Sequence, residues 1–240
     1  MYLKMFNIIS TIILAGLIMG QSKPVHANEA AQLTNIQKSM IPVAAFTATG
    51  DIDKLKPALI TALDNGTSIN QLKEVLIQMY AYAGFPRSLN AINALIDVLD
   101  KRKAKGIEDE VGEEAKPLSS KINRNEYGNK VRNELVGIDL TNNPARYAQF
   151  SPAIDAFLKE HLFADIFGRK LLSHQDREII TVSALAAMHG TESQLKAHLM
   201  IAHNTGLTYS QLSAIAKELE KCGEPQAANR ITSLLKEMPN

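Results

Sequence analysis

The chain contains few of the residues on which thiol, disulfide and aromatic chemistry depend. Its 240 residues include one cysteine, Cys222, and no tryptophan, and aromatic residues make up only 5%. A single cysteine excludes an intramolecular disulfide, and the absence of a CxxC motif excludes dithiol redox chemistry within one chain. The formal charge is +1, which gives no indication of a nucleic-acid partner or an acidic substrate.

One long apolar run is present, and it is too short to be a typical membrane span. Residues 5–19 are mainly apolar, follow Lys4, and precede the small-residue site Val25-His26-Ala27. A spanning helix needs about 20 apolar residues. The pattern predicts a signal peptide over residues 1–27 that is cleaved after Ala27. We therefore expect a periplasmic or secreted protein with no membrane attachment after cleavage.

The rest of the sequence is an internal duplication. It aligns with itself at an offset of 140 residues and, after a one-residue slip, at an offset of 139. Matched pairs include Ala44/Ala184, Gly50/Gly190, Leu55/Leu195, Leu59/Leu199, Gly66/Gly206, Gln71/Gln211, Gly84/Gly223, Pro86/Pro225 and Asn90/Asn229. We predict a first repeat over residues 28–105, a charged linker over 106–126, and a second repeat with its leading helices over 127–240.

The local patterns predict an all-α fold. Each repeat reads as helices separated by turns, because apolar residues recur at helical spacing and no sustained alternating pattern is present. Sequences typical of capping boxes open several predicted helices: Ser68-x-x-Gln71, Thr191-x-x-Gln194 and Thr208-x-x-Gln211. A further helix is predicted from near Ser173 to about Met188, and its apolar composition on all sides indicates burial.

Three of the six histidines fall within residues 189–203. Histidines that share a metal on one helix are three or four residues apart, whereas His198 and His203 are five apart and so lie about 140° apart around a helix. We therefore predict no metal site. His198 lies beside the apolar stripe and is either a general acid/base or a hydrogen-bonded core histidine. His189, at a predicted turn, is a second catalytic candidate, and His203 is expected on the outer face.

The duplication allows a comparison within the chain. The counterparts of His198, His189 and Glu178 are Ala58, Thr49 and Lys38, so the fold does not itself require these polar residues. The first repeat has a polar set of its own in Glu74, Gln78, Tyr80 and Tyr82. Glu74 and Gln78 share a helix face, and they are either part of a ligand site or a polar pair between packed helices.

Several segments resemble the carboxymuconolactone decarboxylase family of the alkylhydroperoxidase D-like superfamily. DREIITVSALAAMHGTESQLKAHLMIAHNTGLT resembles the family's core motif, and KEVLIQMYAYAGFPRSLNAI resembles the helix that follows it. NEYGNKVRNELVG and FLKEHLFADIFGR resemble its leading segment. The resemblance implies an all-α fold and self-association, usually as trimers or hexamers of small subunits.

Two branches of that superfamily give different expectations. The peroxidase branch uses a helix glutamate, a CxxC and a histidine; Glu178 and His198 match, but Thr191 and Gln194 stand where the cysteines would be. The decarboxylase branch also lacks the cysteines. By that resemblance, Arg177 is a candidate carboxylate clamp, His198 a candidate acid, and His161 or Glu178 a candidate to orient the imidazole.

These observations predict a lyase or isomerase without a cofactor, acting on a small organic acid or lactone. We assign His198, Glu178 and His189 as catalytic candidates, and Arg177, His161, Glu74 and Tyr80 as candidates for substrate binding. The expected partners are a small-molecule substrate and further copies of the chain, with no nucleic acid. A thiol-type antioxidant enzyme and a non-catalytic binding protein are the alternative functions.

Overall fold

The computed structural model describes residues 32–238. The predicted signal peptide lies outside these residues. Every regular element of the described part is helical, which confirms the all-α prediction. In chain order the helices are α2 (Asn35–Thr49), α3 (Ile52–Asp64), α4 (Ile69–Ala83), α5 (Phe85–Ala104), α6 (Arg124–Val136), α7 (Arg146–Phe150), α8 (Pro152–Phe157), the π-helix η1 (Leu158–Ile166), α9 (His174–Ala187), α10 (Glu192–Asn204), α11 (Tyr209–Lys221) and α12 (Pro225–Leu235).

The helix starts follow from side chains that satisfy free backbone N–H groups. Ser68, Ser173 and Thr208 each form a complete capping box with the residue three positions later, as this sequence pattern indicates. Gly84 ends α4 with a φ of 84°, a conformation in which a residue with a Cβ would be strained. Pro86 then occupies the first turn of α5, where its missing N–H costs nothing.

The capping box predicted at Thr191 is wrong. The Thr191 hydroxyl makes no cap hydrogen bond and instead donates to the Leu185 carbonyl oxygen at 2.8 Å. Gln194 accepts a hydrogen bond from the Ser193 hydroxyl. The tight turn between α9 and α10 places Thr191 over the end of the preceding helix, so tertiary packing overrides the local pattern.

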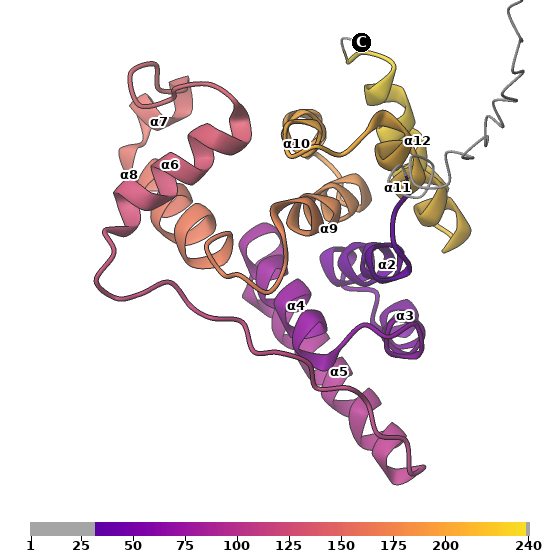
Figure 1. Cartoon of the computed structure of the whole chain (residues 1–240). Helices are drawn as coiled ribbons and strands as arrows, with labels where there is room; N and C mark the ends of the chain where they lie inside the picture. The colour runs from indigo at the N-terminus through magenta and orange to yellow at the C-terminus, as the bar shows by residue number, and fades with distance from the viewer. Residues whose placement is uncertain (1–31, 239–240) are drawn as a thin grey trace, which may run out of the picture.

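The two repeats pack on each other in a reciprocal way. Helices α2 and α9, which are counterparts, lie side by side at the centre of the molecule (Figure 1). Helix α4 of the first repeat contacts α9, and its counterpart α11 contacts α2. Because helices of both repeats pack around α9, every residue from Arg177 to Ala187 is buried. The arrangement is that of a symmetric dimer built from one chain.

Helices α6 and η1 form a tight hairpin that covers one side of α10 (Figure 1, upper left). Gly128 lies at their crossing, and a Cβ there would stand 1.7 Å from the Lys159 carbonyl oxygen. The hairpin has its own apolar core, which includes Val131, Leu135 and Phe163. π-Helices are rare and are frequent at functional sites.

The segment between the repeats is docked on the first repeat. After α5 ends at Ala104, it runs back alongside that helix (Figure 1). The carbonyl oxygens of Glu110 and Val111 accept hydrogen bonds from the backbone N–H groups of Ile69 and Asn70, which are free donors at the start of α4. Within residues 32–238, no helix combines the length and apolar character needed to cross a membrane.

Candidate functional site

His198 and Glu178 form a hydrogen-bonded pair between α10 and α9. The distance from His198 Nδ1 to Glu178 Oε2 is 2.8 Å. The Glu178 side chain is completely buried, and its other oxygen, Oε1, has no hydrogen-bond partner among the described residues. A carboxylate only accepts hydrogen bonds, so Nδ1–H is the donor and Nε2 is left for a ligand. The pair therefore fixes both the tautomer and the orientation of the imidazole.

His198 opens onto a cavity of about 450 Å³ between α10 and the α6–η1 hairpin. Its side chain is 12% exposed, whereas Glu178 lies behind it with no exposure. The cavity is lined by Arg132, Val136, Leu140, Tyr147, Leu158, Leu162, Phe163, Ser193, Gln194, Ala197, His198 and Ile201. This volume falls in the range of small-molecule sites.

Tyr82 brings the first repeat to the same site. Its ring meets the His198 ring edge to face, with centroids 5.8 Å apart. Burial, and after it the negative charge of Glu178, raises the pKa of Tyr82 well above its ordinary value. Tyr82 is therefore a neutral phenol at any physiological pH. The site is composite, because α4 of one repeat and α9 and α10 of the other build it together.

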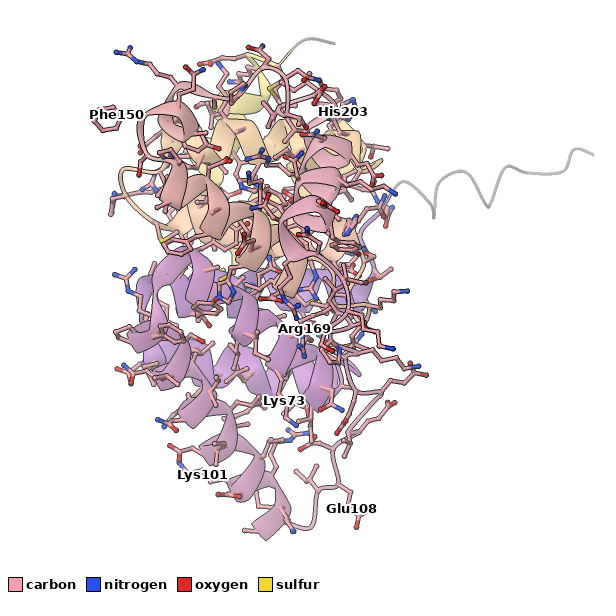
Figure 2. The ribbon with its side chains drawn as sticks, turned by 90° about the vertical axis from the view of Figure 1, so that its left-hand side faces the viewer. Lys73, Lys101, Glu108, Phe150, Arg169 and His203 are labelled. Carbon is pink, nitrogen blue, oxygen red and sulfur yellow. The ribbon has the colours of Figure 1, made fainter. Side chains whose placement is uncertain are left out.

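A buried ionic network lies next to Glu178 in the chain. Arg177 is fully buried and donates to Glu74 Oε2 at 3.1 Å and to Gln78 Oε1 at 3.0 Å. Arg169 binds the same Glu74 through two nitrogens, at 2.8–3.0 Å. Burial lowers the pKa of Arg177, and the hydrogen bond to Glu74 opposes this effect. Figure 2 shows Arg169 where the first repeat meets the second.

Two of the predicted substrate-binding residues, Arg177 and Glu74, belong to this buried network and do not face the cavity. Arg177 and Glu74 were assigned to the substrate, but both are engaged by protein groups, and neither lines the His198 cavity. The Gln78 amide donates to the Arg177 carbonyl oxygen and to the Thr181 hydroxyl. Together these bonds hold α4 against α9 at the level of Glu178.

The remaining candidates lie apart from the His198–Glu178 pair. Tyr80 stacks on Phe85 with centroids 4.6 Å apart and meets the His161 ring at 5.2 Å. His161 pairs with Asp165 at 3.2 Å, so it is Glu178 that contacts the His198 imidazole. His189 is exposed at the α9–α10 turn, with its Nδ1 3.3 Å from Arg230.

The third histidine of the stretch, His203, lies outside the cavity. His203 is exposed and its Nδ1 lies 2.9 Å from the Leu207 carbonyl oxygen. Within residues 32–238, no group of three or more His, Cys, Asp or Glu side chains is placed to hold a metal ion. The polar side chains that line the cavity are His198, Arg132, Tyr147, Ser193 and Gln194.

Comparison with known families agrees with this architecture. The carboxymuconolactone decarboxylase family model matches residues 25–97 and 152–236, together well over half of the chain. The chain belongs to the carboxymuconolactone decarboxylase family. The two matched regions confirm a member with two repeats. A search of curated proteins found no match.

In this carboxymuconolactone decarboxylase family protein only one repeat carries the histidine pair. The α10 residues that line the His198 cavity have counterparts on α3 that line a second hollow of about 380 Å³. The second hollow contains Ala58 in place of His198, and it is not covered by an α6–η1 hairpin. Cys222 also lines it, and burial raises the pKa of this thiol to about 11.

Sequence reasoning did not assign Arg132 or Tyr82 to the site. A signal for Arg132 was present, because Gly128, Val131, Arg132 and Leu135 recur at helical spacing and form the buried face of α6. A charged residue on such a face needs a partner or a function. Tyr82 lies on the same helix as Glu74 and Tyr80, and the sequence does not distinguish the three. Only the tertiary structure shows that Tyr82, and not the other two, meets the His198 ring.

Proposed function

We propose that the mature protein is a lyase or isomerase without a cofactor that acts on a small organic acid or lactone, with His198 as general acid/base. The observation that carries the proposal is the hydrogen bond from His198 Nδ1 to the buried Glu178, on an imidazole that opens onto a cavity. Family membership supports the general class of chemistry.

The geometry suits proton transfer to and from carbon. When a carboxyl group leaves as CO₂, its bonding electron pair remains on the substrate, and a positioned acid must protonate that carbon. His198 Nε2–H can deliver the proton, and the Glu178 carboxylate stabilises the imidazolium that precedes transfer. In an isomerisation, the same nitrogen removes a proton from one carbon and returns it to another.

The test is turnover of a panel of γ-lactone acids and unsaturated small acids, followed by NMR and CO₂ release. We expect His198→Gln to lower kcat by at least about 100-fold, since general acid/base groups typically contribute 10²–10⁴. His203→Gln, on the same helix but outside the cavity, is the matched control and should stay within twofold of the parent. Equal turnover by the His198 and His203 variants would remove His198 from the mechanism.

Glu178 is a positioning residue in this proposal, because it acts through His198. We expect Glu178→Gln to lower kcat more than it changes KM and to move the pH profile of kcat. A side chain with only a packing role would change the melting temperature and leave the pH profile unmoved. Binding of ligands without turnover by the parent protein would instead favour a non-catalytic binding protein.

Self-association is a second part of the proposal. Helices α7 and α8 carry large apolar side chains that are exposed in the single chain: Tyr147, Phe150, Ile154 and Phe157. Phe150 is 91% exposed and its ring stands off the ribbon in Figure 2. Light scattering coupled to gel filtration should give a mass of three chains or more, and Phe150→Ser should reduce it. A monomeric mass at micromolar concentration would contradict this part.

A further inference from the structure

We infer that Arg132 anchors the anionic end of the ligand in the His198 cavity, so that the cavity selects monoanions with an apolar body. The inference deepens the proposed function by naming the ligand class of the same site. It rests on the proposed function only for what happens after binding, since binding itself can be measured without turnover.

Charge is the first observation. Arg132 is the only formally charged side chain among the described residues that line the cavity, and no carboxylate lines it. The residue is 5% exposed, and its Nε has no hydrogen-bond partner in the described structure. A buried guanidinium nitrogen without a partner is costly, and a ligand oxyanion would supply the missing acceptor.

The ion pair of Arg132 does not cancel the positive charge beside the cavity. Asp155 is shared between Arg132, at 2.5 Å, and Lys159, at 2.9 Å. Burial raises the pKa of Asp155, but hydrogen bonds from Lys159 and Arg132 more than offset this, and the net pKa is lowered. Asp155 is therefore ionised at neutral pH, and the three side chains together carry one net positive charge.

The remaining walls define the body of the ligand. Most of the lining side chains are apolar: Val136, Leu140, Leu158, Leu162, Phe163, Ala197 and Ile201. A ring or short hydrocarbon fits this surface, because burying apolar area is favourable. A second negative charge on the ligand would find no further permanent cation among the lining residues, and the apolar walls would not replace its hydration.

The position of Arg132 agrees with the asymmetry between the repeats. Arg132 comes from α6. The α6–η1 hairpin supplies both the cation and most of the apolar walls of the His198 cavity, and it contributes no residue to the hollow on α3. Arg177, the other candidate clamp, is sealed from the cavity and already bonded to Glu74 and Gln78. The hollow on α3 should therefore not bind the same ligands.

The experiment compares 4-phenylbutyrate with 4-phenylbutan-1-ol, which share a carbon skeleton and end in a charged carboxylate and a neutral alcohol. Each probe is titrated into the mature protein and followed by calorimetry and ligand-detected NMR. For the parent, we expect the acid to bind at least about tenfold more tightly than the alcohol, as one charge-assisted hydrogen bond allows.

Two variants at the ion pair should affect acid binding differently. Arg132→Gln should weaken binding of the acid about tenfold and leave binding of the alcohol within twofold. Asp155→Asn removes the negative charge beside the guanidinium and should leave acid binding equal or tighter. If Arg132 only stabilises the fold, both variants should weaken both probes together. Equal affinity of the parent for acid and alcohol would also overturn the inference, even if Arg132→Gln did not fold.

Two steric variants locate the binding event. Ala197→Phe projects a ring into the His198 cavity and should abolish binding of both probes. Thr61→Phe, at the counterpart of Ile201 on α3, should have no effect. The reverse pattern would place the ligand on α3 and refute the assignment. His198→Gln should keep acid binding while losing turnover, which separates failure of this inference from failure of the proposed mechanism.

Discussion

Substitution of Glu74 by glutamine should be among the most destabilising conservative changes in the chain. Glu74 is 3% exposed and accepts hydrogen bonds from Arg169 and Arg177, which lie on the far side of the contact between the repeats. Glutamine preserves the shape of the side chain and removes its charge. Arg177, with no exposure, would then keep a buried positive charge without a counter-ion.

The magnitude follows from that burial. Removing one partner of a buried ion pair typically costs about 3–5 kcal/mol, because the remaining charge stays desolvated. Arg169 is 23% exposed and can recover part of its hydration, so we assign most of the cost to Arg177. In a chain of this size, a loss of 1 kcal/mol lowers the melting temperature by about 2–4 °C. We therefore expect Glu74→Gln to melt about 10 °C below the parent.

The assay is urea and thermal unfolding of Glu74→Gln, Arg177→Met and the double variant Glu74→Gln/Arg177→Met. The double variant should be more stable than the sum of the single losses predicts, with a coupling energy of at least about 1.5 kcal/mol, since neither charge remains. Asp97→Asn, which breaks an exposed ion pair with Lys56, is the control and should not change the melting temperature. A shift below about 2 °C for Glu74→Gln would refute the reasoning.

Two further changes test other parts of the structure. Gly128→Ala should cost at least about 2 kcal/mol in unfolding free energy and lower ligand affinity, because the new Cβ would lie 1.7 Å from the Lys159 carbonyl oxygen. The control is Gly66→Ala, at a φ of 85° with no atom within 4 Å, which should cost about 1–2 kcal/mol and leave ligand affinity unchanged. Burial raises the pKa of Cys222 from 9.0 to about 11, so alkylation by iodoacetamide should be slow at pH 8 and accelerate toward pH 11. Since the unfolded thiol then loses its proton at lower pH than the folded one, the parent should lose more stability than Cys222→Ser between pH 9 and 11. Cys222→Ser should also leave turnover unchanged, and loss of activity in that variant would restore the thiol-type alternative.

Much of the fold could be predicted because its signals are local or repeated. Ser68, Ser173 and Thr208 satisfy their own helix starts, and an internal repeat is visible without a structure. The capping box predicted at Thr191 does not form, because the Thr191 hydroxyl donates to the Leu185 carbonyl oxygen across a turn, a contact that the local pattern does not indicate. The close approach of Gly128 to the backbone of η1 is a tertiary contact, which no local pattern indicates.

The candidate site was predictable only in part. His198 and Glu178 come from the family resemblance and from the absence of a counterpart in the first repeat, and the structure brings them within 2.8 Å. Arg177 was assigned to the substrate because sequence alone does not show which cation is sealed in the core. Export remains a prediction, since it rests on residues outside the part of the chain that the structure describes.

The covalent fusion of the two repeats has a consequence for stoichiometry. In a dimer of identical subunits, both subunits carry every substitution. Two different residues, such as Ala58 and His198 here, could therefore not occupy equivalent positions in the two halves. Here they do, and only one of the two related hollows lies under the α6–η1 hairpin. A saturating titration should therefore end at one ligand per polypeptide rather than one per repeat, whatever the size of the assembly.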